Sequence, residues 1–420
     1  MSRKLWWTIG VVAVVAVVVL FLVFGNVFPR GGTPAATGSS APGTTSAPSP
    51  TAVPTTAAPT TAAAPSVDPA QALAALKLAS MSLEQKVGQV LMVSSPVTGA
   101  STESLYAVDK LPVGNVFMKG RSTAGTDGIA AVVKDITGHI NGDRTEGVLP
   151  FVSTDQEGGL VQIMRGPGFA DMPQAIEQGQ VAPATLEANA TQWGRELAAV
   201  GVNVNLAPVL DVVPSAEFAP QNAPIGAFGR EYGYTPQTVS MHGLAFAQGM
   251  LSAGINPTVK HFPGLGRVTA NTDVAAGVTD NVTVRNDPFI APFRDAVNAG
   301  VPWLMVSNAF YPKIDPTNLA PFSTVIVNDM VRGDLGFKGI IVSDDICDAV
   351  QVSAVPVADR GVDFIEAGGT MALCTNESLM PAMYQGLLAG AQKDPALAKQ
   401  VTAAALLVLE AKAVNGLIVK

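Results

Sequence analysis

Polar residues able to do acid–base chemistry follow a series of short apolar stretches along the chain. In chain order they are Asp155-Gln156-Glu157, Asp211, Lys260-His261, Asn308, Asp344-Asp345 and Asn376. Several carboxylates with cationic and amide donors beside them suit cleavage of a glycosidic bond, which needs one ionised carboxylate as nucleophile and one protonated acid at the leaving oxygen. Each residue alone has an alternative role as a helix cap or loop-closing group. Loop closure does not require a polar group after nearly every stretch, so the whole set indicates one pocket.

Cysteine and histidine usage gives no support to a metal or redox site. The two cysteines, Cys347 and Cys374, do not form a CxxC pair, and the three histidines, His139, His242 and His261, are far apart. Zinc sites and thioredoxin-like sites need closer, regular spacings of these residues. The sequence therefore predicts neither a metal nor a cofactor.

The elements that must position the polar residues are alternating strands and helices. Strands are expected at residues 90–93, 114–118, 150–154, 202–206, 257–260, 303–307, 339–343 and 370–373. Helices are expected between them, for example at 185–200, 236–253, 288–299 and 324–335, and a capping box, Ser82-x-x-Gln85, begins an early helical turn. Eight such βα units predict a (β/α)8 barrel of the TIM type. An open doubly wound sheet is the alternative, although no GxGxxG motif follows the first strand.

Residues 5–28 form an apolar segment that predicts a transmembrane helix. At about 1.5 Å per residue, this segment crosses the ~30 Å hydrocarbon layer. Arg3 and Lys4 precede it, which favours a cytoplasmic N-terminus and export of the remainder. A cleaved signal peptide is the alternative, but its apolar region is ordinarily about 7–15 residues long, and no A-x-A site follows here. We therefore expect an uncleaved single-pass anchor within residues 1–30.

The next segment, residues 31–66, consists almost entirely of Thr, Ala, Pro, Ser and Gly. It lacks the large apolar side chains of a core, and its prolines keep the chain extended, so it predicts a disordered linker. The folded catalytic domain is expected at residues 67–420, outside the cytoplasm and tethered to the cell membrane.

The formal net charge of −8 and the isoelectric point near 5.0 restrict the partners of the chain. A nucleic acid or an anionic membrane surface attracts basic proteins, so neither is expected as the main partner of the catalytic domain. The charge fits a neutral or mildly charged substrate. We expect a monomer.

Several runs resemble glycoside hydrolase family 3, and most closely its single-domain β-N-acetylhexosaminidase branch. They are Lys260-His261-Phe262-Pro263-Gly264, Asp155-Gln156-Glu157-Gly158-Gly159, Gly336-Phe337-Lys338-Gly339-Ile340-Ile341-Val342-Ser343-Asp344-Asp345, Ala207-Pro208-Val209-Leu210-Asp211 and Glu84-Gln85-Lys86-Val87-Gly88-Gln89. The resemblance implies a retaining β-glycosidase for a cell-wall or other extracellular glycan, with Asp344 as nucleophile. It also implies that Asp155, Lys260 and His261 hold sugar hydroxyl groups, and Asp211 and Asn308 are further candidates for substrate binding.

The chain departs from the family pattern where the acid/base group belongs. In the resembling branch an Asp-Ser-His loop follows the lysine–histidine run, whereas Asn271 and Asp273 stand at the aspartate and histidine positions here. Asp273 is a carboxylic acid and is the candidate acid/base, with an ordinary loop aspartate as the alternative. The family's sugar-binding arginine is displaced, and Arg230 is the candidate replacement. A barrel that binds glycan without turnover is the competing function.

The two cysteines are candidates for a disulfide. Cys347 lies three residues past Asp344, and Cys374 ends the last expected strand. The last two strands are neighbours in a barrel, so the two Cα atoms could lie within the roughly 4.4–6.8 Å that a disulfide requires. An extracytoplasmic domain would allow such a bond to persist. Two reduced, buried cysteines are the alternative.

Overall fold

The computed structural model describes residues 68–140 and 142–418. The predicted transmembrane anchor at 5–28 and the predicted linker at 31–66 lie outside these residues. Within the described ranges, no helix is both long and apolar enough to cross a membrane.

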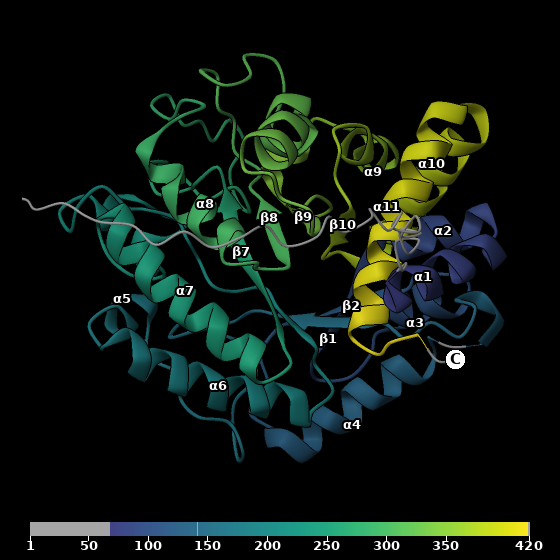
Figure 1. Ribbon diagram of the computed structural model, residues 1–420, viewed down its shortest axis with the longest axis horizontal. Coiled ribbons are helices and arrows are strands. Elements are labelled where there is room, and N and C mark those ends of the chain that lie inside the picture. Colours follow the sequence, from purple (N-terminus) through teal and green to yellow (C-terminus); the bar gives the residue numbers. More distant parts are fainter. Residues whose placement is uncertain (1–67, 141, 419–420) are drawn as a thin grey trace, which may run out of the picture. The chain divides into compact units, whose positions relative to one another are not determined.

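The described residues form a closed barrel of eight parallel strands surrounded by helices (Figure 1). The strands are β1 (Leu91–Pro96), β2 (Asn115–Lys119), β3 (Phe151–Thr154), β6 (Val204–Asn205), β7 (Asn256–Phe262), β8 (Trp303–Val306), β9 (Ile340–Asp345) and β10 (Met371–Cys374). Each strand pairs with the next barrel strand in the chain, and β10 closes the ring by pairing with β1. The predicted (β/α)8 barrel is confirmed, and each of its eight strands overlaps a predicted one.

Two α-helices precede the first strand, and the others follow strands as expected for βα units. The α-helices are α1 (Pro69–Ser80), α2 (Leu83–Gln89), α3 (Thr102–Asp109), α4 (Gly125–Gly138), α5 (Ala175–Gln178), α6 (Pro183–Ala199), α7 (Pro236–Ser252), α8 (Ala291–Asn298), α9 (Val357–Glu366), α10 (Met380–Lys393) and α11 (Pro395–Val414). Short 3-10 turns lie at Gly142–Arg144, Ala219–Gln221, Gly226–Phe228, Pro288–Ile290, Ala320–Phe322, Val350–Val352 and Glu377–Leu379. The predicted capping box is present, because Ser82 and Gln85 each accept a hydrogen bond from the backbone N–H of the other.

Two details differ from the expected elements. The helix expected at 324–335 is a π-helix over Val325–Asp334. An unexpected antiparallel hairpin, β4 (Gln156–Gly158) with β5 (Val161–Gln162), follows β3. Gly158 allows the hairpin to form, because its φ is 113° and a Cβ there would collide with the Pro173 carbonyl.

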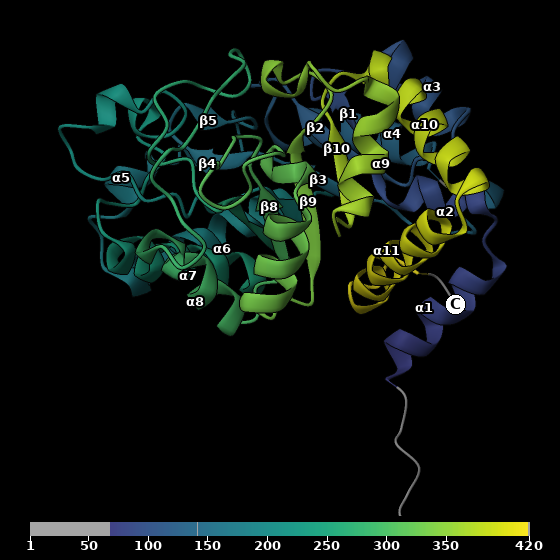
Figure 2. The same ribbon diagram turned by 90° about the horizontal axis from the view of Figure 1, so that it is seen from above.

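The two ends of the described chain close the base of the barrel, at the amino ends of the strands. Helix α1 packs against α11, and α2 packs against α10 and α11 (Figures 1 and 2). Asp68, which caps α1, lines the same surface hollow as Asn256 and Ile340, the first residues of β7 and β9. Asp68, the first described residue, therefore lies at the base.

Large buried side chains fill the base. Phe151 begins β3 and Trp303 begins β8, and their rings pack edge to face with centroids 4.9 Å apart. Lys412 of α11 is fully buried beside them, and its Nζ donates to Gln89 Oε1 at 2.8 Å and to the Gly114 carbonyl at 3.1 Å. The interior at the base is thus a packed core, and the cavity that the charged residues line lies at the opposite end of the strands.

Candidate active site

A cavity of about 240 Å³ opens at the carboxyl ends of the strands. Loops after the strands supply most of its lining, as is usual for enzymes built on this barrel. The predicted site residues that line it are Asp155, Arg230, Lys260, His261, Asp273 and Asp344. Asp345, which was expected at the pocket without a specific role, also lines it, as do Asp348 and Thr375, which were not predicted.

Lys260, near the end of β7, carries its charge into this cavity between two carboxylates. Its Nζ lies 2.6 Å from Asp155 Oδ1 and 2.6 Å from Glu157 Oε1, and its side chain is 3% exposed. Burial lowers the pKa of Lys260, but the carboxylates of Asp155 and Glu157 outweigh that effect, so the net result is a raised pKa. The ammonium group therefore stays charged.

Glu157, on β4, fixes a second cation at the cavity. Its carboxylate accepts from Arg230 Nε and Nη2, both at 2.8 Å, in a bidentate pair. Burial raises the pKa of Glu157, yet Arg230 and Lys260 outweigh burial and bring the pKa down to about 2. Glu157 was expected among the polar residues around one pocket, but it was assigned no catalytic or substrate-binding role. Its place two residues after Asp155 does not indicate that it pairs with Arg230 and Lys260.

His261 is oriented by Asp211 from behind the cavity. Asp211 Oδ2 lies 2.7 Å from His261 Nδ1, and Oδ1 accepts from the backbone N–H groups of His261 at 3.2 Å and Leu265 at 2.7 Å. The other ring nitrogen of His261, Nε2, lies 3.4 Å from Arg230 Nη2 at the cavity. Asp211 itself is fully buried.

Asp344 lies near the end of β9 with its carboxyl group at the cavity. Burial raises its pKa to about 6; the negative charge of Asp273 also raises it, whereas His261 and Lys260 lower it. Its Oδ1 accepts a hydrogen bond of 2.8 Å from the backbone N–H of Asp345. Asp344 therefore ionises within the ordinary working range of enzymes.

Asp273 reaches the cavity from the loop after β7 and is itself exposed. Hydrogen bonds tie this loop to the turn after β9: the Asp273 carbonyl accepts from Val350 N–H and the Thr272 carbonyl from Gln351 N–H, both at 3.1 Å. Asn271 accepts from the backbone N–H of Asp273 at 2.9 Å. Asn271 thus shapes the turn that presents Asp273.

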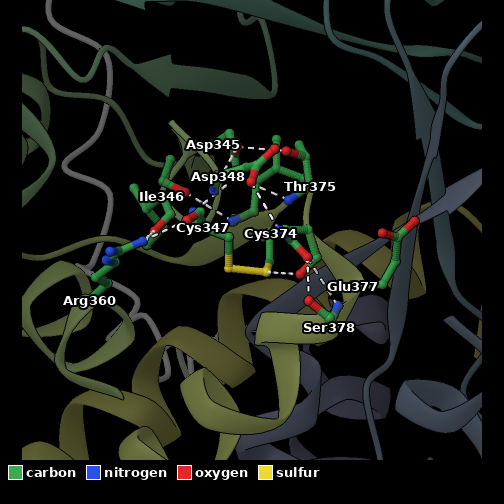
Figure 3. The surroundings of a disulfide bond; sticks show 12 residues. Asp345, Ile346, Cys347, Asp348, Arg360, Cys374, Thr375, Glu377 and Ser378 are labelled. Carbon is green, nitrogen blue, oxygen red and sulfur yellow. Dashed lines mark hydrogen bonds between the residues drawn. A yellow bond between two sulfur atoms is a disulfide. The ribbon is translucent and has the colours of Figure 1, made fainter. Parts of the chain in front are cut away.

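The predicted disulfide is present between Cys347 and Cys374, whose Cα atoms are 4.9 Å apart (Figure 3). Cys347 lies in the turn after β9, and Cys374 is the last residue of β10. The bond therefore joins the turn behind Asp344 to the neighbouring strand.

Comparison with known proteins decides the family. Residues 82–410 match the glycosyl hydrolase family 3 N-terminal domain. The chain belongs to glycoside hydrolase family 3. Its structure resembles the crystal structure of the β-N-acetylhexosaminidase from Beutenbergia cavernae, with a TM-score of 0.79 and 50% sequence identity over 80% of this chain and 99% of that one.

Further relatives are also named as hexosaminidases or glucosaminidases. A β-hexosaminidase of Nitrosomonas eutropha is 34% identical over 257 residues, which are 59% of this chain and 70% of that protein. A family 3 β-N-acetylglucosaminidase from a Paenibacillus strain matches with a TM-score of 0.70 and 26% identity, over 80% of this chain and 64% of that one. The protein is a glycoside hydrolase.

In this family 3 barrel, two of the predicted substrate-binding residues lie away from the cavity. Asp211 contacts His261, and Asn308 is buried with its Nδ2 donating to the Asp345 carbonyl at 2.7 Å. Both follow barrel strands, as predicted, but their side chains contact His261 and the Asp345 backbone and do not line the cavity. We therefore assign them to positioning. Arg230, predicted as a replacement arginine, does line the cavity.

Proposed function

We propose that this enzyme is a retaining β-glycosidase of β-N-acetylglucosaminidase-like specificity, with Asp344 as nucleophile and Asp273 as general acid/base. One observation carries the proposal. The carboxyl groups of Asp344 and Asp273, which come from the end of β9 and from the loop after β7, line the same cavity. Paired carboxyl groups at one site are what retaining cleavage requires.

The first step breaks the glycosidic bond. An oxygen of ionised Asp344 attacks the anomeric carbon, while the bond from that carbon to the leaving oxygen breaks and Asp273 transfers its proton to that oxygen. The products are a glycosyl ester on Asp344, a free alcohol and ionised Asp273.

The second step restores the enzyme. Water attacks the anomeric carbon of the ester and gives a proton to Asp273, and the ester bond to Asp344 breaks. Two displacements at one carbon leave the sugar with its original configuration. The enzyme regains an ionised Asp344 and a protonated Asp273.

Sugar binding falls to the charged groups around Lys260. Asp155 Oδ1 and Lys260 Nζ, together with Arg230 and His261 Nε2, offer donors and acceptors to sugar hydroxyl groups. Their mutual ion pairs hold them in place before substrate arrives, which reduces the ordering cost of binding.

We further propose that the catalytic barrel, residues 67–420, acts outside the cytoplasm as a monomer on cell-wall or other extracellular glycan. The apolar segment at 5–28, its preceding basic residues and the linker composition at 31–66 support this placement. Digestion of the barrel by added protease in spheroplasts, together with retention of the protein in carbonate-washed membranes, would test it. A protease-resistant barrel inside intact spheroplasts would contradict it.

The catalytic proposal is tested with a panel of aryl β-glycosides, including the N-acetylglucosaminide. We expect turnover, a product of retained configuration by NMR, and a glycosyl adduct on Asp344 by mass spectrometry with a slow 2-fluoro substrate. A protein that binds these glycosides without cleaving any of them would favour the competing function, a glycan-binding barrel.

A further inference from the structure

The residue after the proposed nucleophile is held at both ends of its backbone. The Asp345 N–H donates to Asp344 Oδ1 at 2.8 Å, and the Asp345 carbonyl accepts from Asn308 Nδ2 at 2.7 Å. A donor at a carboxylate stabilises its ionised form and fixes its plane. Among the residues that the structure describes, none forms a hydrogen bond to Asp344 Oδ2, so that oxygen is left for attack on the substrate.

The Asp345 side chain holds two segments together. Its Oδ1 accepts from the backbone N–H groups of Cys347 at 2.9 Å and Thr375 at 3.0 Å. Its Oδ2 accepts from Asp348 N–H at 3.0 Å and from Thr375 Oγ1 at 2.6 Å. Figure 3 shows this carboxylate between the turn after β9 and the residues after β10. Four donors around one carboxylate satisfy a group that only accepts when ionised.

The same two segments are also joined covalently. The Cys347–Cys374 disulfide links them, and Arg360 Nη1 donates to the carbonyls of Ile346 at 3.1 Å and Cys347 at 2.6 Å (Figure 3). The turn directly after Asp344 is therefore fixed by a carboxylate, a guanidinium group and a disulfide.

We propose that Asp345, together with the Cys347–Cys374 disulfide, is a positioning device that sets the orientation and the ionisation of Asp344. The inference rests on the proposed role of Asp344 as nucleophile. A nucleophile must be aligned with the anomeric carbon before attack, so small displacements are costly in rate. Because the Asp345 N–H also lowers the pKa of Asp344, loosening the turn alters both alignment and ionisation.

The central test is Asp345→Asn. The amide keeps the shape of the side chain but turns an NH2 group toward N–H donors, so at least one of the four bonds is lost. We expect kcat to fall about 10- to 100-fold with KM changed less than about threefold. The acid limb of kcat/KM should move to higher pH, because the N–H that favours ionised Asp344 is no longer held. If Asp345 had only a structural role, Asp345→Asn would lower the melting temperature and leave the acid side of the pH profile of kcat/KM unchanged.

A matched pair at Thr375 controls for general damage. Thr375→Ser keeps the hydroxyl group that donates to Asp345 Oδ2, so the acid limb should stay within error of the wild type. Thr375→Val has nearly the same shape without the hydroxyl group, so it should shift the limb in the same direction as Asp345→Asn. Circular dichroism shows whether each variant is folded.

The disulfide gives a test without mutation. Dithiothreitol converts the bond to two thiols and becomes its own cyclic disulfide, and iodoacetamide then blocks the thiols. We expect a smaller loss of kcat and a smaller shift of the acid limb in the same direction. If Asp345→Asn does not fold, Thr375→Val and the reduced protein decide the question.

A folded Asp345→Asn protein with wild-type kcat and pH profile would overturn the inference, as would a lower kcat with an unmoved acid limb. Other results would contradict the proposed function. These are turnover by the Asp344→Asn protein, or a glycosyl adduct on a residue other than Asp344. The two failures are therefore distinguishable.

Discussion

Each end of the barrel buries a lysine, and the pKa values of the two lysines shift in opposite directions. At the cavity, Lys260 Nζ lies 2.6 Å from each of two carboxylates, and its pKa is raised. At the base, Lys412 donates to an amide oxygen and a carbonyl, forms no salt bridge within the described residues, and burial brings its pKa well below the ordinary range. Burial is similar, so the partners decide which form is stable.

The difference between the two lysines indicates that the cavity end serves function and that the base serves stability. Charged groups cost less to bury where they are paired, and the cavity gathers such pairs because a sugar and a developing charge must be bound there. At the base, burial in a packed core favours the neutral form of the Lys412 amine. Changes at the cavity end should therefore alter rate and its pH dependence, and changes at the base should alter stability alone.

The largest effect is expected for Asp344→Asn. Loss of the nucleophile should lower kcat by about three or more powers of ten without unfolding the barrel. Steady-state kinetics with an aryl glycoside measures it, and Asp171→Asn, a change at a carboxylate that is 91% exposed, serves as control. Turnover near the wild-type value in a folded Asp344→Asn protein would remove the assignment.

Asp273→Ala should be next in size and should depend on the leaving group. Substrates with poor leaving groups need a proton and should lose about 10²- to 10⁴-fold in kcat/KM, whereas nitrophenyl glycosides should lose far less in the first step. Azide should restore part of the turnover of the activated substrate by forming a glycosyl azide. Equal losses for good and poor leaving groups, without azide rescue, would mean that another residue donates the proton.

The pH dependence of the wild type should follow Asp344. The nucleophile must be ionised and its pKa is raised to about 6, so kcat/KM should fall as pH drops through about 6. Lys260→Met should move this limb to higher pH, because Lys260 is one of the groups that lowers the pKa of Asp344. It should also cost about 10- to 100-fold in kcat/KM through lost sugar contacts. An unmoved limb would show that the charge of Lys260 does not reach Asp344.

The smallest effect on rate is expected at the base. Lys412 loses its proton more readily when folded than when unfolded, so the unfolded chain binds more protons and stability should rise with pH toward about 10, by up to about 1.4 kcal/mol per pH unit. Lys412→Met should abolish this slope and leave kcat/KM unchanged. Urea unfolding between pH 7 and pH 10 measures it. Identical slopes in both proteins would show that Lys412 is charged in the folded state.

The barrel could be predicted because its strands are short apolar stretches separated by helical periodicity. Boundaries were less accurate where buried polar residues extend a strand: the stretch predicted at 90–93 continues as β1 through Ser94 and Ser95, both fully buried. The β4–β5 hairpin was missed because its residues are polar and glycine-rich. Periodicity also does not distinguish the π-helix at Val325–Asp334 from an α-helix.

The site could be predicted as a set, but the direction of each side chain could not. Asp211 and Asn308 follow barrel strands and Asp344 lies near the end of one, yet Asp344 alone of the three lines the cavity. The role of Glu157 depends on Arg230 and Lys260, which lie 73 and 103 residues further along the chain and meet it only after the barrel closes. The sequence indicates where a strand ends, but the contacts of the side chains at that end depend on the tertiary structure.

Asp68, the first described residue, and the cavity lie at opposite ends of the barrel strands. Asp68 lies beside the first residues of β7 and β9, whereas the cavity opens where those strands finish. A substrate can therefore enter the cavity at the carboxyl ends of the strands without passing the surface beside Asp68, and substitutions on that surface should leave the geometry of the site unchanged.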